Sequence, residues 1–98
     1  ALSTAANSAE NDILDEEHDA LRRSLHGVIY LYDNAHYQYQ QGFVSDEFWA
    51  TTRASLKSFM ENSFVYDVIM ARLDTGMRPE FRAVVVSVSE ELEITQGN

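Results

Sequence analysis

The sequence predicts an all-α protein, a three- to four-helix bundle built on a long N-terminal helix and an αα-hairpin. Two observations lead to this prediction. Apolar residues recur at intervals of three and four along most of the chain, which is the period of an amphipathic helix. The periodic segments are separated by short stretches with residues typical of helix ends, namely Gly42, Ser45 and Pro79.

Length and composition indicate one domain. The chain has 98 residues, of which 45% are hydrophobic, enough for a modest core. We expect residues 1–9, which are mostly small or polar, to form a flexible lead-in or linker, and residues 10–95 to form the helical domain. The absence of cysteine excludes disulfides and thiolate chemistry. A net charge of −9 argues against nucleic-acid partners, because phosphates require clustered Lys and Arg.

The longest helix is expected from about Glu10 to Gln41, roughly 45–50 Å at 1.5 Å per residue. Acidic residues from Asp12 to Glu17 lie near this expected start, where the helix dipole favours negative charge. Gly27 interrupts the pattern and offers a close approach to a neighbouring helix. The stripe expected to face the core comprises Leu14, His18, Leu21, Leu25, Val28, Tyr32, Ala35 and Tyr39.

A short corner separates this helix from the next, expected over Asp46–Glu61. Gly42 suits the left-handed position that ends a helix, and Ser45 suits the N-cap of the helix that follows. Val44 and Trp49 have the spacing of a hydrophobic staple. The expected core residues of this helix are Phe48 or Trp49, Thr52, Leu56, Phe59 and Met60.

Two shorter helices complete the prediction. Asn62 and Ser63 interrupt the chain before a helix over Phe64–Leu73, whose expected core residues are Val65, Val68, Ile69 and Leu73. Pro79 suits the first position of a last helix, over residues 79–92. The valines of this segment favour a strand by propensity. Because Phe81, Val85, Val88 and Leu92 fall on one helical stripe, and a lone strand would have no partner, we expect a helix.

No pattern indicates catalysis, a metal site or a cofactor. Asp15-x-x-His18 and Asp33-x-x-His36 resemble the carboxylate–histidine pairs of di-iron bundles. They lie on one helix, about 27 Å apart at 1.5 Å per residue, too far to share a metal ion. Asp74-Thr75-Gly76 matches the aspartic-protease triplet, but that chemistry needs two such carboxylates. We therefore expect a protein that is not an enzyme.

A second stripe on the long helix predicts an interaction surface. His26, Tyr30, Asp33 and Tyr37, with Gln40 or Gln41, lie away from the core-facing stripe. Tyr30 and Tyr37 would anchor the contact, since tyrosine combines an apolar body with a polar tip. Leu14, Leu21 and Leu25 would extend it. The leading prediction is a protein-interaction or self-association module, present as a homodimer or bound to a protein partner.

Two other hypotheses remain open at this point. Tyr32, His36, Tyr39 and Trp49 together could line a pocket for a small ligand or a metal ion, which would make the domain a sensor. Alternatively, the acidic charge could attract a basic partner, in contacts that weaken with salt.

Three segments also carry a family resemblance. The run Asn34-Ala35-His36-Tyr37-Gln38-Tyr39-Gln40-Gln41-Gly42, then Glu47-x-Trp49, then Pro79-Glu80-Phe81-Arg82, resembles a group of small bacterial proteins with a domain of unknown function. The resemblance covers about residues 20 to 90. Members carry an N-terminal membrane helix before a helical cytoplasmic region. The resemblance therefore implies the soluble cytoplasmic part of a protein tethered to the inner membrane through a segment absent from this chain. It brings no catalytic residues or cofactor.

Overall fold

The computed structural model describes the backbone of residues 2–95 and the side chains of residues 15–94. Within this range it contains four α-helices and no strand: α1 (Leu2–Gln40), α2 (Asp46–Met60), α3 (Ser63–Ala71) and α4 (Pro79–Thr95). The prediction of an all-α protein is confirmed. The more specific expectation of a bundle built on a helical hairpin stays a prediction.

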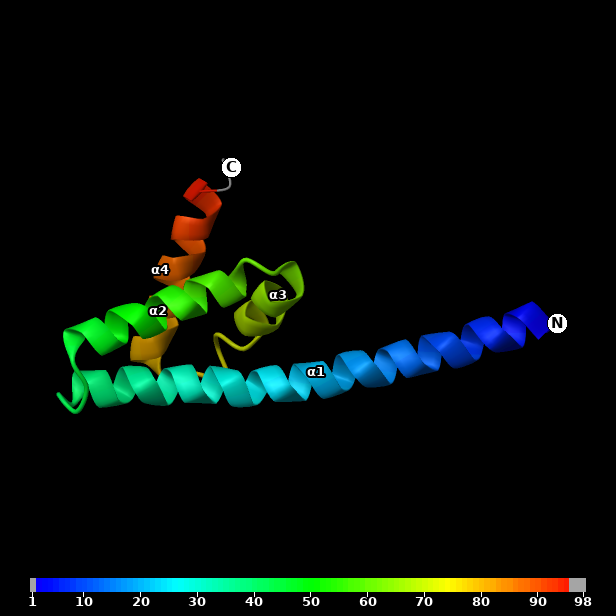
Figure 1. Cartoon of the computed structure of the whole chain (residues 1–98), viewed down its shortest axis with the longest axis horizontal. Coiled ribbons are helices and arrows are strands. Elements are labelled where there is room, and N and C mark those ends of the chain that lie inside the picture. Colours follow the sequence, from blue (N-terminus) through cyan, green and yellow to red (C-terminus); the bar gives the residue numbers. More distant parts are fainter. Residues whose placement is uncertain (1, 96–98) are drawn as a thin grey trace.

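The four helices are arranged around the C-terminal half of α1. After the corner, α2 turns back over α1, and α3 packs against both (Figure 1). α4 crosses the pair and points away from α1, so that its last turns lie far from the N-terminal part of α1 (Figure 1). The N-terminal part of α1 extends well beyond the other helices, along the molecule's 61 Å axis.

The start of α1 differs from the prediction. The helix begins at Leu2 rather than at about Glu10, so residues 2–9 have a helical backbone. Asp15, Glu16 and Glu17 consequently lie roughly three and a half turns inside the helix, and its first turn has no acidic residue. The expected stabilisation of these acids by the helix dipole is therefore wrong, since that effect is confined to the first turn. The division into a lead-in over 1–9 and a domain over 10–95 stays a prediction.

The corner between α1 and α2 follows the predicted chemistry. Gly42 has a φ of 82°, in the left-handed region. Its N–H donates to Tyr39 O at 3.0 Å, and Phe43 N–H donates to Gln38 O at 2.9 Å. These two bonds form a Schellman motif, which satisfies the last carbonyls of α1. Ser45 Oγ accepts from Phe48 N–H at 3.0 Å and caps α2, as predicted.

The remaining helix boundaries also match the sequence signals. The side chain of Asn62 accepts from Phe64 N–H and Val65 N–H, which caps α3 where the chain was expected to break. α4 begins at Pro79 and stays helical through its valines, so the hydrophobic period outweighs β-propensity here. The core cluster of buried apolar residues is Leu25, Ile29, Trp49, Leu56, Met60, Val65, Val68, Ile69, Met77, Phe81, Val85, Val88 and Leu92.

Several expected core residues lie elsewhere. Leu21, Phe48 and Phe59 are exposed, and Trp49 rather than Phe48 is the buried aromatic residue of the first turns of α2. On α1 the buried face contains Leu25 and Ile29, with Tyr32, Ala35 and Tyr39 partly buried beside it. Of the predicted stripe, Leu25, Tyr32, Ala35 and Tyr39 thus lie in or against the core, whereas His18 and Leu21, nearer the N-terminal end, are exposed.

Candidate functional site

The predicted interaction residues separate into exposed and buried groups. Tyr30 is 68% exposed and Tyr37 42% exposed, on the surface of α1 that was predicted to be free. Leu31, 64% exposed, was not predicted and lies next to Tyr30. Leu21 is exposed and His26 is half-buried. The side chain of Leu14 lies outside the described residues.

Leu25 and Asp33 were predicted to belong to the interaction surface, but both are buried, so these two predictions are wrong. Leu25 is buried in the core, where α3 and the rest of the core cluster cover it. Asp33 is only 7% exposed, because the turn between α3 and α4 packs over it. Neither side chain is available to a partner in this fold.

An ion pair explains how a carboxylate can be buried at this position. Asp33 Oδ1 lies 2.9 Å from Arg78 Nε, and Asp33 Oδ2 accepts from the backbone N–H of Arg78 at 3.0 Å. A buried charge is tolerated when it is paired and hydrogen-bonded. The Arg78 guanidinium also lies over the Tyr37 ring, 4.2 Å from its centroid, as a cation–π contact. Asp33 therefore positions the guanidinium that lies over the Tyr37 ring.

Of the four predicted pocket residues, His36, Tyr39 and Trp49 pack their rings on one another. The His36 ring centroid is 4.8 Å from that of Trp49 and 6.1 Å from that of Phe81. Tyr39 stacks on Trp49 with a centroid distance of 5.7 Å. Such distances are those of direct aromatic packing, so a ligand would have to separate the rings to enter. The ligand-sensor hypothesis stays a prediction, and the geometry favours a structural role.

Polar groups at the edge of this aromatic cluster join α1 to α2. The Tyr32 hydroxyl and Ser55 Oγ are 2.7 Å apart. A hydrogen bond to the Asp46 carboxylate raises the pKa of Tyr39. Both tyrosines therefore have an apolar ring on the core and a polar tip at its rim, the arrangement that buried tyrosines usually adopt.

Burial determines the protonation of His36. Loss of hydration lowers the pKa of His36 below 6.5, and Arg78 lowers it further, while Asp33 and Glu80 act in the opposite direction. A similar effect acts on His26, where burial and then Arg72 and Arg22 lower the pKa. Both imidazoles are thus biased toward the neutral form.

The two carboxylate–histidine pairs do not form a metal site. No group of three or more His, Cys, Asp or Glu residues in the described part of the chain could hold a metal ion. The His18 ring packs on Phe64 of α3 at 5.5 Å, and Asp33 is occupied by Arg78. Asp74, Thr75 and Gly76 form the turn after α3, where Gly76 N–H donates to Arg72 O at 2.9 Å. Asp, Thr and Gly are ordinary turn formers.

A second charged cluster was missed by sequence reasoning. Glu91 on α4 accepts from Arg53 Nη2 at 2.5 Å and from Lys57 Nζ at 3.3 Å, both on α2. The hydrogen bond from Arg53, followed by that from Lys57, lowers the pKa of Glu91 from 4.5 to about 2. The i,i+4 spacing of Arg53 and Lys57 was the available signal, but nothing in the sequence pairs them with Glu91.

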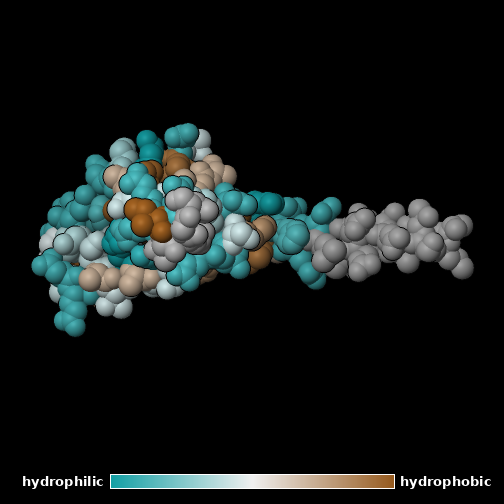
Figure 2. All heavy atoms as spheres, turned by 90° about the horizontal axis from the view of Figure 1, so that it is seen from above, coloured by the Kyte–Doolittle hydropathy of each residue, from teal (hydrophilic) through white to brown (hydrophobic). Residues whose placement is uncertain are grey.

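Figure 2 shows the molecule from the side on which α2 and α4 lie. Hydrophobic residues appear there as small patches separated by hydrophilic ones. None of the helices in the described part of the chain combines the length and apolar character needed to span a membrane.

Comparison of the chain with protein-family models, with curated proteins and with solved structures found no match.

Proposed function

We propose that this protein is a self-association module in which α1 packs against α1 of a second copy. The observation that carries the proposal is the exposure of Tyr30 and Tyr37, one heptad apart on the same side of α1. Large aromatic residues at exposed positions are enriched at protein–protein contacts.

The length of α1 supports the same proposal. α1 has 39 residues, whereas α2, α3 and α4 have 15, 9 and 17. The three shorter helices gather on one side of its C-terminal half (Figure 1). Much of α1 is therefore accessible to a partner, and a helix of this length in a small domain gains stability mainly by packing a second surface.

An antiparallel, two-fold arrangement suits the charges and the spacing. Tyr30 and Tyr37 are about 10.5 Å apart along α1 at 1.5 Å per residue. In an antiparallel pair centred between them, Tyr30 of each copy meets Tyr37 of the other, which is the reciprocity that two-fold symmetry requires. The acidic segment from Asp15 to Asp19 then lies at opposite ends of the dimer. A parallel pair would place the two acidic segments side by side.

The Tyr37 side chain is already held in place within the monomer. Arg78 lies over one face of its ring at 4.2 Å, and Asp33 holds Arg78 in turn. A side chain whose conformation is already fixed loses less entropy on binding. This contact supports Tyr37 as an anchor rather than a mobile surface residue.

A second part of the proposal rests on the family resemblance, which is carried by residues 34–42, Glu47, Trp49 and 79–82. The chain would be the cytoplasmic part of a membrane-anchored bacterial protein. Its corner would join α1 and α2 into the αα-hairpin of a helical bundle.

The test is the solution mass, measured by light scattering over a series of concentrations. We expect the wild-type chain to approach twice its 11.2 kDa mass as the concentration rises. The double variant Tyr30→Ala, Tyr37→Glu should shift this transition to at least tenfold higher concentration. Ile94→Ala, which shortens a 78% exposed apolar side chain on α4, is the control and should leave the transition unchanged. A wild-type chain that stays monomeric at high micromolar concentration would exclude the proposal.

A further inference from the structure

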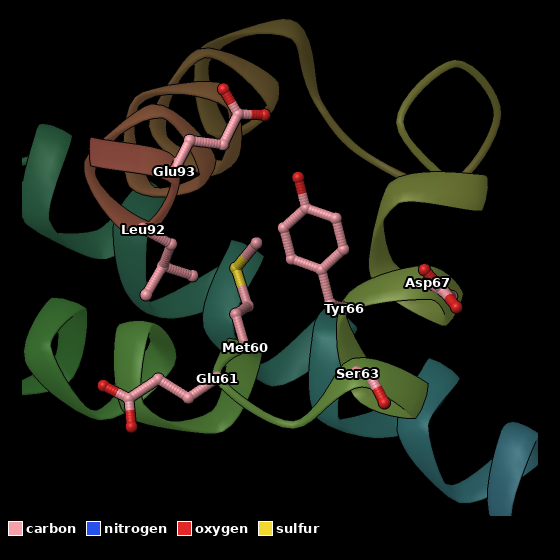
Figure 3. Close-up of a pocket in the computed structure, with 7 residues that line it drawn as sticks. All are labelled: Met60, Glu61, Ser63, Tyr66, Asp67, Leu92 and Glu93. Carbon is pink, nitrogen blue, oxygen red and sulfur yellow. The ribbon is translucent and has the colours of Figure 1, made fainter. Parts of the chain in front are cut away.

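A groove lies where α2 ends, α3 begins and α4 makes its last turns. Its volume is about 240 Å³. Figure 3 shows Leu92 and Glu93 on α4, Leu92 directed toward Met60 and Glu93 at the edge, with α2 and α3 forming the other walls. The lining residues are Met60, Glu61, Ser63, Tyr66, Asp67, Leu92 and Glu93.

The lining combines an apolar floor with an acidic rim. Met60 and Leu92 are buried at the base, and the half-buried Tyr66 ring stands beside them. The Glu93 carboxylate lies on the same side of the groove as the Tyr66 hydroxyl (Figure 3). Glu61 and Asp67 are at the outer edges with their carboxylates turned away from the centre (Figure 3). Among the described residues, neither lysine nor arginine lines the groove.

Helix ends add to the negative potential. α2 ends at Met60 and α4 at Thr95, so both place the negative end of their dipole near this groove. Lys57 in the last turn of α2 offsets the dipole of that helix, whereas α4 has no basic residue in its last turn and Glu93 lies close to its end. The positive end of α3 is also near, but Asn62 already caps its first N–H groups. A cation in the groove would lie against the negative end of α4 and the Glu93 carboxylate.

From this complementarity we infer that the groove receives a lysine or arginine side chain from a basic segment of a partner protein. The methylene stem packs on Met60 and Leu92, since long basic side chains bury their stems on apolar surface. The charged end faces Glu93 and the Tyr66 ring, which attracts a cation through its π-face. The volume suits one such side chain and is below that of usual small-molecule sites, roughly 300–1,000 Å³.

The test uses the full chain, ¹³C-labelled at the methionine methyl groups and ¹⁵N-labelled at the amides. The probe is the acetylated and amidated peptide Gly-Ser-Arg-Ser-Gly, titrated to millimolar concentration. We expect the Met60 methyl signal and the Tyr66 and Glu93 amide signals to shift and saturate. The same peptide with citrulline, which keeps the shape of arginine without its charge, should bind at least tenfold more weakly.

Two variants of α4 assign the binding to the groove. Glu93→Gln removes the carboxylate beside Tyr66 and should weaken binding about tenfold, equivalent to about 1.4 kcal/mol. Glu90→Gln removes the same charge from an exposed position of α4 outside the groove, and should leave the affinity unchanged.

Equal binding of the citrulline peptide, equal effects of the two variants, or groove signals that shift only with protein concentration would overturn the inference. The last result would indicate a second copy in the groove. Self-association through Tyr30 and Tyr37 does not use these residues, so the two proposals stand or fall separately.

Discussion

Asp33 and Arg78 are joined twice across 45 positions of the chain, through the Arg78 guanidinium at 2.9 Å and its backbone N–H at 3.0 Å. The first contact neutralises a carboxylate that is almost fully buried, and the second anchors the turn that precedes α4. Because the same guanidinium lies over Tyr37, one pair links the fold to the proposed contact surface.

The first prediction concerns this pair. Asp33→Ala should lower the free energy of unfolding by about 2 kcal/mol, since it leaves the Arg78 backbone N–H without its acceptor and removes a charge-assisted bond. Urea denaturation followed by circular dichroism measures the change. Asp74→Ala, an exposed carboxylate in the neighbouring turn, is the control and should change stability by less than about 0.5 kcal/mol. Equal effects of the two variants would show that the pair contributes nothing specific.

The second prediction concerns the stability of the protein at low pH. The pKa of Glu91 is about 2 in the fold and 4.5 as a free group, so its pairing with Arg53 and Lys57 stabilises the protein fully above pH 4.5. This contribution should be lost as the pH falls from 4.5 toward 2. Glu91→Gln should therefore flatten the dependence of the melting temperature on pH in that window. The carboxyl ¹³C signal of Glu91 should titrate with a midpoint near 2, and a midpoint near 4.5 would contradict the pairing.

The third prediction concerns His36. Because burial lowers its pKa, the unfolded chain binds a proton there at a higher pH than the folded chain does. Stability should thus decrease as the pH falls below 6.5 and through the folded pKa. His36→Phe keeps an aromatic ring against Trp49 without a titrating group, and should reduce this decrease. Melting temperatures between pH 5 and pH 7.5 provide the comparison. An unchanged pH dependence in the variant would exclude His36 as its source.

The fourth prediction compares Gly42→Ala and Gly27→Ala, which should change the free energy of unfolding in opposite directions. A Cβ at Gly42 or at Gly27 meets no atom within 4 Å, so only the backbone distinguishes them. Gly42 has a φ of 82°, and Gly42→Ala should cost about 1 kcal/mol. Gly27 is in the middle of α1, and Gly27→Ala should stabilise the fold by up to about 1 kcal/mol. Thermal unfolding at low concentration measures both, and a stabilising Gly42→Ala would contradict the left-handed corner.

The corner after α1 and the start of α4 were predictable because they depend on local chemistry, whereas the start of α1 at Leu2 was not predicted. Gly42, Ser45 and Pro79 each act through their own backbone or side chain within a few residues, so the sequence places the corner and the start of α4 correctly. The buried face of α4 was predictable for a related reason. Phe81, Val85, Val88 and Leu92 lie in a helix that is covered along much of its length, where period alone identifies the core.

The face of α1 was harder to predict, because burial there depends on which helices cover it. Leu21 was predicted in the core and is exposed, although His18 and Arg22 contact Phe64 of α3, so spacing alone does not identify the side of α1 that the other helices cover. Asp33 was predicted to be exposed, because no local signal reveals a partner 45 residues away. The Glu91 cluster was missed for the same reason. Tyr30 and Tyr37 keep their predicted exposure, while the interface itself stays a prediction.

The central claim, that α1 pairs antiparallel with α1 of a second copy, is tested most directly by disulfide trapping. The chain has no cysteine, so a single introduced cysteine reports only on its own position. Asn34→Cys lies next to the proposed two-fold axis between Tyr30 and Tyr37, and should form a disulfide-linked dimer under mild oxidation. Ser24→Cys is also on α1, but its two copies would be about 28 Å apart at 1.5 Å per residue, and it should stay unlinked. Equal trapping at the two positions, or trapping at Ser24 alone, would contradict the arrangement.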